Sequence, residues 1–137
     1  CALFHPQGLC AIPGELLSEV FPVRVSVLGV QYALEYRTKA NDKGLETCDG
    51  YCDTSAKLCV VRKYTAAERR EPLSLKDLDA YMRKCMRHEL THAFLYESGL
   101  SVNGMSPESW PTNEEMVDWM AIQGPKLYDA WKRAGCL

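Results

Sequence analysis

Two histidines and a glutamate in the second half of the chain have the types and spacing of a metal-dependent hydrolytic site. They lie in the segment 87–94 (RHELTHAF), where His88, Glu89 and His92 form the pattern HExxH. Residues four apart are separated by about 40° around an α-helix, so both imidazoles project from one face and can bind one ion. Neutral imidazole nitrogen is a preferred ligand of Zn²⁺. Glu89 lies at the flank of this face, where it can reach a metal-activated water without binding the metal itself.

A catalytic zinc site requires a third protein ligand and leaves the fourth position to water. The remaining histidine, His5, lies far upstream, whereas a predicted helix downstream offers carboxylates. Thr112 and Glu115 fit a capping box at the start of that helix, which gives Glu115 a structural role and leaves Glu114 as the predicted ligand. Asp118 follows Glu114 by four residues, on the same face. We expect Asp118 to accept the second ring N–H of a zinc-bound histidine, the first histidine of the motif.

These two segments resemble the gluzincin metallopeptidases, in which a helix carrying HExxH is followed by a second helix carrying Asn-Glu-x-x-x-Asp. Here the second pattern is 113–118 (NEEMVD). The phrases HAFLYESGL and NEEMVDWMAIQ are similar to minimal gluzincin-type domains and to phage or clostridial relatives of the ImmA/IrrE-type peptidases. The resemblance covers about residues 23–128.

The resemblance implies a zinc-dependent endopeptidase that acts on a peptide or protein substrate. It implies zinc as the cofactor, Glu89 as the general base and acid, and Asp118 as support for a ligand. The implied zinc ligands are His88, His92 and Glu114. Larger gluzincins use an additional His or Tyr to stabilise the oxyanion, and three residues are candidates for that donor: Tyr96, Tyr128 and His5.

A zinc domain that binds without cutting, as an interaction or structural module, is the alternative function. Glu89 distinguishes the endopeptidase from the non-catalytic module. A structural zinc site tends to close its fourth position with a protein ligand, whereas a free glutamate beside an open position activates water. A peptide substrate could add as a strand to an exposed sheet edge, and the segment 58–62 is predicted to be that edge. The substitution Val60→Pro is then expected to weaken peptide binding and leave the metal in place.

The elements that must position this site begin with strands. Alternating apolar and polar residues predict strands within 23–36, as a hairpin or one long bent strand, and at 50–53 and 58–62 around a turn at 53–56. Together they predict a small, mainly antiparallel sheet of three to four strands. The polar segment 63–72 is predicted to be a solvated linker.

Helices follow the strands, so the fold class is α+β. The resemblance to gluzincins implies that this α+β domain is zincin-like. A long active-site helix is predicted over 75–98, after a capping box at Ser74 and before Gly99. A glutamate helix follows over 112–123, and Pro125 is predicted to start a separate C-terminal helix. Four basic residues share one side of the long helix and are expected to face solvent: Lys76, Arg83, Lys84 and Arg87.

The length of 137 residues, with 47% hydrophobic and 25% charged residues, fits a single domain over 23–137. Proline and glycine interrupt the segment 1–22, which is predicted to be irregular. A net charge of −2 gives no field that would gather nucleic acid, and no apolar run is long enough to span a membrane. We expect a cytoplasmic protein, and an exported or lipid-anchored form stays open because the chain starts at Cys1. The pattern predicts no oligomeric state.

Seven cysteines are too few for a disulfide scaffold, and their odd number leaves one unpaired. Reduced thiols are the simpler interpretation. Cys59 and Cys85 lie in apolar segments and are predicted to be small core residues. Cys48 and Cys52 resemble half of a metal site, but no second pair follows at a suitable spacing.

Overall fold

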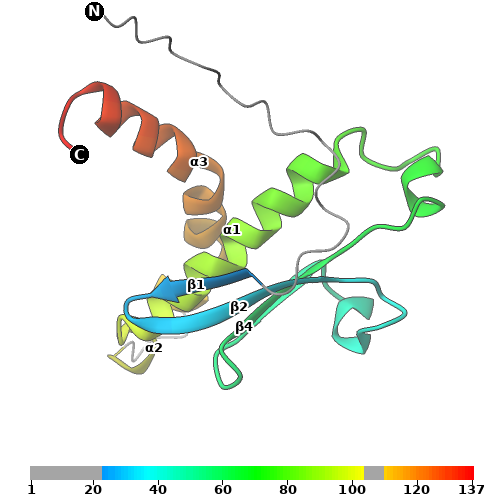
Figure 1. The fold of residues 1–137 in the computed structure, drawn as a ribbon, viewed down its shortest axis with the longest axis horizontal. Coiled ribbons are helices and arrows are strands. Elements are labelled where there is room, and N and C mark those ends of the chain that lie inside the picture. The colour runs from blue at the N-terminus through cyan, green and yellow to red at the C-terminus, as the bar shows by residue number, and fades with distance from the viewer. Residues whose placement is uncertain (1–22, 104–109) are drawn as a thin grey trace, which may run out of the picture.

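A computed structural model describes residues 23–103 and 110–137, with the backbone alone at 102, 103 and 111. Within these residues the α+β order is confirmed: a four-stranded sheet precedes two long helices (Figure 1). The strands are β1 (Val23–Val27), β2 (Val30–Arg37), β3 (Gly50–Asp53) and β4 (Leu58–Arg62). The helices are α1 (Leu78–Glu97), the short α2 (Leu100–Asn103) and α3 (Glu114–Arg133). Single 3₁₀ turns lie at Lys43–Glu46, Glu68–Arg70 and Trp110–Thr112.

The strand order is β1-β2-β4-β3, which makes β1 and β3 the edges of the sheet. β1 pairs antiparallel with β2, and β3 with β4, whereas the central pair β2 and β4 is parallel. The sheet is therefore mixed, because the chain crosses to the far edge as β3 and then turns back to place β4 beside β2. The prediction that 58–62 is an exposed edge was wrong, since β4 is covered by a strand on both sides. The free edge near the helices is β3.

A tight hairpin joins β1 to β2. Its two turn residues, Leu28 and Gly29, have φ angles of 49° and 92°. Positive φ at both central residues matches the twist of the flanking strands, and glycine adopts it without a steric cost. The sequence left open a hairpin or a bent strand in this segment, and the structure contains the hairpin.

The core lies between one face of the sheet and α1 (Figure 1). Side chains from the two sides pack together as one cluster, and its buried members are Val27, Tyr32, Cys59, Val61, Met82, Cys85, Met86 and Ala93. The prediction that Cys59 and Cys85 are core residues is confirmed. Burial of this cluster is the main force holding α1 against the strands, at about 25 cal/mol for each Å² of apolar surface removed from water.

The long helix starts three residues later than predicted. Asp77, not Ser74, caps α1, and its side chain accepts a hydrogen bond from the backbone N–H of Ala80 at 2.8 Å. The helix ends before Gly99, as predicted, and Gly99 has a φ of 81°. The connection between the two predicted helices contains α2 and the start of the 3₁₀ turn at Trp110–Thr112, and its residues 104–109 lie outside the described residues.

The glutamate helix and the predicted C-terminal helix are one continuous helix, α3, with Pro125 inside it. Proline has no N–H, so it leaves the carbonyl of Ala121, one turn earlier, without its helical donor. Arg87 of α1 fills this position by donating its Nε–H to that carbonyl. The helix therefore continues through the proline, and the same bond ties α3 to α1. The prediction that Arg87 faces solvent was therefore wrong.

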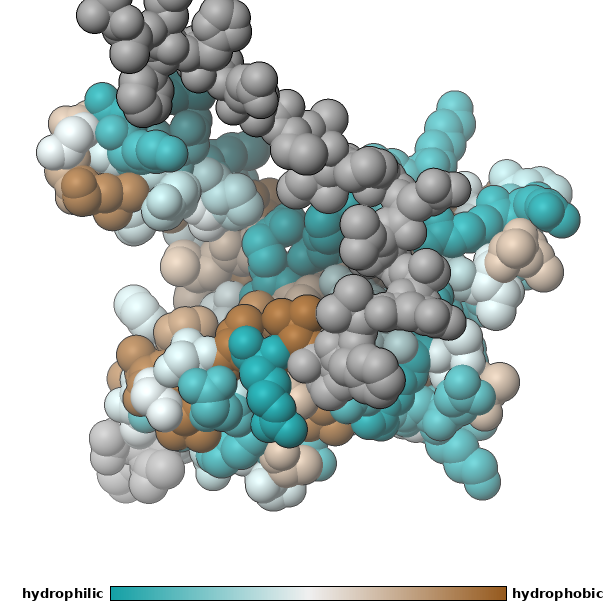
Figure 2. Space-filling model, viewed as in Figure 1, coloured by the Kyte–Doolittle hydropathy of each residue, from teal (hydrophilic) through white to brown (hydrophobic). Residues whose placement is uncertain are grey.

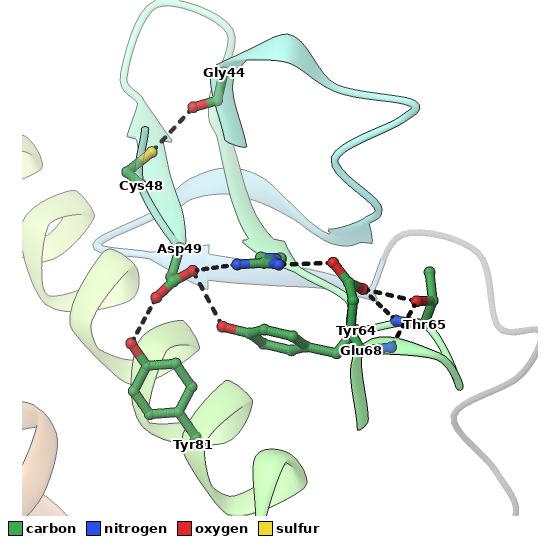
Figure 3. A network of polar contacts seen from close by, with 8 residues as sticks. Gly44, Cys48, Asp49, Tyr64, Thr65, Glu68 and Tyr81 are labelled. Atoms are coloured by element: carbon green, nitrogen blue, oxygen red, sulfur yellow. Dashed lines mark hydrogen bonds and ion pairs between the residues drawn. The ribbon is translucent and has the colours of Figure 1, made fainter. Parts of the chain in front are cut away.

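The start of β3 is held by a polar cluster around Asp49 (Figure 3). Its carboxylate accepts hydrogen bonds from Tyr81 of α1 at 2.8 Å and from Tyr64 at 3.1 Å, and pairs with Arg62 of β4 at 3.3 Å. Burial alone would raise the pKa of Asp49, but these three donors outweigh burial and lower it. The cluster fixes the edge strand β3 to α1 and to the end of β4.

The segment after β4 is more ordered than the predicted solvated linker. Thr65 and Glu68 form a reciprocal pair: the Glu68 carboxylate accepts from the Thr65 N–H at 2.7 Å, and the Glu68 N–H donates to the Thr65 hydroxyl at 3.3 Å (Figure 3). Arg62 adds an ion pair to Glu68 at 2.7 Å. Arg69 pairs with Asp79 in the first turn of α1. Two charges of the segment, Glu68 and Arg69, are therefore paired with charges on its flanks.

Hydrophobic side chains gather on the face shown in Figure 2. Val23 of β1 and the turn residue Leu28 are more than half exposed. The C-terminal half of α3 projects away from the sheet and α1 (Figures 1 and 2), and its Tyr128 and Trp131 are exposed. Among the described residues, no helix combines the length and the hydropathy that crossing a membrane requires.

Candidate metal centre

Three side chains from α1 and α3 converge on one point. The Nε2 atoms of His88 and His92 lie 3.1 Å apart. Glu114 brings its Oε2 to 3.0 Å from His88 Nε2 and its Oε1 to 3.4 Å from His92 Nε2. In the part of the chain that the structure describes, this is the group of His, Cys, Asp and Glu side chains that could hold a metal ion. The structure thus brings together the three residues predicted as ligands.

The two helices supply these ligands in different ways. α1 presents the histidines from successive turns of one face, as the four-residue spacing predicts. α3 presents Glu114 as its first residue, directly after the cap Asn113, whose side chain accepts from the N–H of Met116 at 2.9 Å. The predicted capping box of Thr112 and Glu115 was wrong by one residue, because asparagine takes the cap position. Glu114 nevertheless reaches the histidines.

The site is closed on the histidine side and open on the carboxylate side. The side chains of His88 and His92 are 16% and 20% exposed, whereas that of Glu114 is 68% exposed. Val117 and Ala121, on the buried side of α3, are fully or almost fully covered. Packing of this apolar side, together with the bond between Arg87 and Ala121, sets the position of α3 that brings Glu114 to the site.

Asp118 contacts His88 as predicted from its position on α3. Its Oδ1 lies 2.8 Å from His88 Nδ1. With the hydrogen on Nδ1, the ring donates to Asp118 and directs the lone pair of Nε2 toward His92 and Glu114. Lys84 adds an ion pair to the same Asp118 oxygen at 2.6 Å. The hydrogen bond from Lys84, followed by that from His88, lowers the pKa of Asp118.

The sequence analysis did not predict the contact between Lys84 and Asp118, because the basic side of the helix was expected to face solvent. A signal for its role was present in the sequence: Lys84, His88 and His92 are successive residues at four-residue spacing, so all three share one helix face. A lysine on that face lies where the second helix must bring its carboxylates.

Glu89 is buried, with 7% of its surface exposed, and lies on the sheet side of the histidines. Burial raises the pKa of Glu89 to about 7, an effect that the nearby charge of Glu114 increases and that of His88 opposes. Its carboxylate packs against Gly50 of β3: a Cβ at Gly50 would lie 2.8 Å from Glu89 Oε1. A carboxyl group in this position can hold or release a proton close to neutral pH.

A pocket of about 460 Å³ opens in front of these side chains. One wall comes from β3 and the turn that follows it, and consists of Gly50, Cys52 and Thr54. The opposite wall comes from α1, with His88, Glu89, His92 and Tyr96, and the rim comes from Ser101, Thr112 and Glu114. The candidate metal group therefore lies between an edge strand and a helix, in a cavity open to solvent.

The sequence analysis did not predict that β3 forms a wall of the pocket, because the residue pattern does not show which strand becomes the edge beside α1. Of the predicted oxyanion donors, Tyr96 lines the pocket. Tyr128 is exposed on the far half of α3 and is not part of the lining, and His5 lies outside the described residues. Cys48 is exposed and Cys52 belongs to the strand wall, and neither is in the candidate metal group.

Comparison with known proteins adds no relative: no protein-family model, no curated protein and no solved structure matches this chain significantly.

Proposed function

We propose that this chain is a zinc-dependent endopeptidase that hydrolyses peptide bonds in a peptide or protein. The observation that carries the proposal is one juxtaposition: the ligand atoms of His88, His92 and Glu114 converge, and a buried carboxyl, Glu89, lines the same pocket. Zinc hydrolases need such a set, namely three ligands, an open position and a base that does not bind the metal.

The three ligands fit zinc by type and spacing. Two imidazole nitrogens and one carboxylate oxygen are common zinc ligands. Tetrahedral zinc with bonds of 2.0–2.2 Å keeps its ligand atoms about 3.3 Å apart. The two histidine Nε2 atoms lie 3.1 Å apart, close to that value. Each has a different oxygen of the Glu114 carboxylate beside it, at 3.0 Å for His88 and at 3.4 Å for His92. Asp118 supports the fit, because it holds His88 in the tautomer that leaves Nε2 free for the metal.

Zinc bound at these ligands would act as a Lewis acid, which lowers the pKa of an attacking water and polarises the scissile carbonyl. Glu89 then performs the proton transfers. Its carboxylate takes the proton of the attacking water and later delivers it to the nitrogen of the leaving amine.

The substrate is expected to bind along β3 rather than β4. β3 is an edge strand, so its outer backbone groups have no partner within the sheet, and an extended peptide can pair with them. Gly50, Cys52 and Thr54 of this strand and its turn line the pocket. A peptide held there would run past Glu89 and the two histidines.

The first test is metal content. We expect about one zinc for each chain by native mass spectrometry of the purified protein, and loss of most of it in His92→Ala and Glu114→Ala. Glu115→Ala is the matched control, because it removes the neighbouring carboxylate of the same helix turn. Loss of zinc in Glu115→Ala but not in Glu114→Ala would overturn the ligand assignment.

The second test is hydrolysis of a peptide library by the zinc-loaded protein. Glu89→Gln is expected to keep zinc and lose cleavage, because the amide cannot accept the proton of water. Glu46→Gln, which changes an exposed glutamate in a 3₁₀ turn away from the site, is expected to behave like the parent protein. Zinc binding without cleavage of any peptide in the library would favour the non-catalytic zinc-binding module, and full cleavage by Glu89→Gln would overturn the general-base role.

A further inference from the structure

Two cysteines face each other across the strands that form the pocket wall. Cys52 of β3 and Cys59 of β4 are directly opposite in the antiparallel register, and their Sγ atoms lie 3.8 Å apart. Arg62 N–H donates to the carbonyl of Asp49 at 2.9 Å, so those two residues form a hydrogen-bonded pair. Pairs alternate along the ladder, which makes Cys52 and Cys59 a non-hydrogen-bonded pair, the type in which side chains approach most closely.

This geometry is suited to a disulfide. Cα atoms in a non-hydrogen-bonded pair are about 4.5 Å apart, within the range of about 4.4–6.8 Å that disulfides span. The two sulfurs already point toward each other, since the Cys59 thiol donates to Cys52 Sγ. Small rotations about the side-chain bonds bring the sulfurs to a bonding distance of about 2.05 Å without moving the strands.

The surroundings assign different roles to the two thiols. Cys59 is fully buried in the core cluster, whereas Cys52 is partly exposed and lines the pocket. The hydrogen bond to Cys52, together with burial, raises the pKa of Cys59. A small oxidant in the pocket can reach the Cys52 sulfur first, and Cys59 is held behind it as the second thiol.

We propose that Cys52 and Cys59 are a redox-active pair that closes into a disulfide across β3 and β4, with a small-molecule disulfide such as oxidised glutathione as the oxidant. In the first step the Cys52 thiolate attacks one sulfur of oxidised glutathione, forms a mixed disulfide and releases one glutathione thiolate. In the second step Cys59 loses its proton and attacks Cys52 Sγ, which expels the second glutathione. The two cysteine thiols are oxidised, and one oxidised glutathione is reduced to two glutathione molecules.

The bond would lie in the wall of the candidate metal centre, two residues along β3 from Gly50. It does not depend on the proposed peptidase function, because neither metal nor substrate takes part in it. The link closes a short loop, so the oxidised protein is expected to unfold at a higher temperature than the reduced protein.

The test is peptide mapping of the Cys48→Ser protein after incubation with oxidised glutathione at neutral pH and alkylation of the remaining thiols. Trypsin cleaves after Lys57 and separates the two cysteines into the peptides 44–57 and 58–62. Removal of Cys48 leaves Cys52 as the one cysteine of the first peptide. We expect a linked pair of these peptides that reduction separates, and a rise in melting temperature of the unreduced protein.

Cys59→Ser is the matched variant. Without the second thiol, the mixed disulfide has no internal route to release glutathione, so glutathione is expected to stay on Cys52. Modification of the exposed Cys136 by glutathione shows that the oxidant has reacted with the parent protein. If Cys52 and Cys59 are then both found alkylated, the proposal is overturned. A link from Cys59 to Cys85 instead of Cys52 would overturn it equally, and neither result requires the variant to fold.

Discussion

Gly50 of the edge strand lies directly against the carboxyl group of Glu89 on α1. A Cβ at Gly50 would lie 2.8 Å from Glu89 Oε1 and 3.2 Å from Glu89 Cγ, closer than side-chain carbons approach such atoms. It would also lie 3.1 Å from the carbonyl oxygen of Val60 on the neighbouring strand. The absence of a side chain at Gly50 thus creates the space in which the proposed general base lies.

Gly50→Ala is therefore expected to displace Glu89 and lower kcat/KM for peptide cleavage by about tenfold to a hundredfold, since small errors in placing a base are costly. Zinc content should not change, because Gly50 is not a member of the candidate ligand group. Steady-state kinetics and native mass spectrometry check the two parts. Gly124→Ala is the control, because a Cβ at that position in α3 meets nothing within 4 Å. Equal activity of Gly50→Ala and the parent protein would contradict the positioning role.

Lys84 is expected to support the metal site through Asp118. Lys84→Met removes the ion pair to Asp118 and so weakens the hold of that carboxylate on His88. Loss of such an outer contact typically lowers metal affinity by about tenfold or more. Competition with a zinc chelator measures the change. Lys76→Met, which changes an exposed lysine ahead of α1, should leave the affinity unchanged, and an equal loss in both variants would point to net charge as the cause.

The proline within α3 and Arg87 of α1 are expected to be coupled in stability. Arg87→Leu leaves the buried carbonyl of Ala121 without a donor and should destabilise the protein by about 1–3 kcal/mol. In Arg87→Leu/Pro125→Ala the alanine N–H can donate to that carbonyl, so part of the loss should be recovered. Urea unfolding of the metal-free proteins in a double-mutant cycle tests this. Additive effects would show that the two residues act independently.

Glu68 is expected to make the free energy of unfolding depend on pH. The backbone N–H of Thr65, then Arg62 and the Thr65 hydroxyl, lower the pKa of Glu68 from 4.5 to about 2. A carboxyl group whose pKa is lower in the folded state stabilises the protein above its unfolded pKa, and the contribution disappears as the pH falls toward the folded pKa. Glu68→Gln should therefore cost about 1–2 kcal/mol at pH 7 and progressively less between about pH 4.5 and pH 2.

Thermal or urea unfolding of the parent protein and Glu68→Gln across this pH range provides the measurement. Glu71→Gln changes an exposed glutamate at the end of the same 3₁₀ turn and should have little effect at any pH. A constant difference between the parent protein and Glu68→Gln from pH 7 to pH 2 would exclude the lowered pKa as its source.

Local pattern was enough to predict the strands and the main helix. β3 and β4 lie at the predicted residues, because alternation and turn chemistry act within a few neighbouring positions. The four-residue spacing placed His88 and His92 on one face, since helix geometry alone relates them. The cap of α3 was predicted one residue early because Thr112 and Asn113 are both good capping residues, and local sequence does not choose between them.

Residue types and spacing were enough to identify the members of the candidate site: the two histidines, Glu89 and the acidic turn that begins α3. They could not show which strand lies beside these residues. β3 became the edge because the chain crosses the sheet and then inserts β4 next to β2, a choice made by long-range pairing that alternation does not encode. Gly50, Cys52 and Lys84 contact the site only in that arrangement. Each of these contacts joins separate elements, which meet only when the sheet, α1 and α3 pack together.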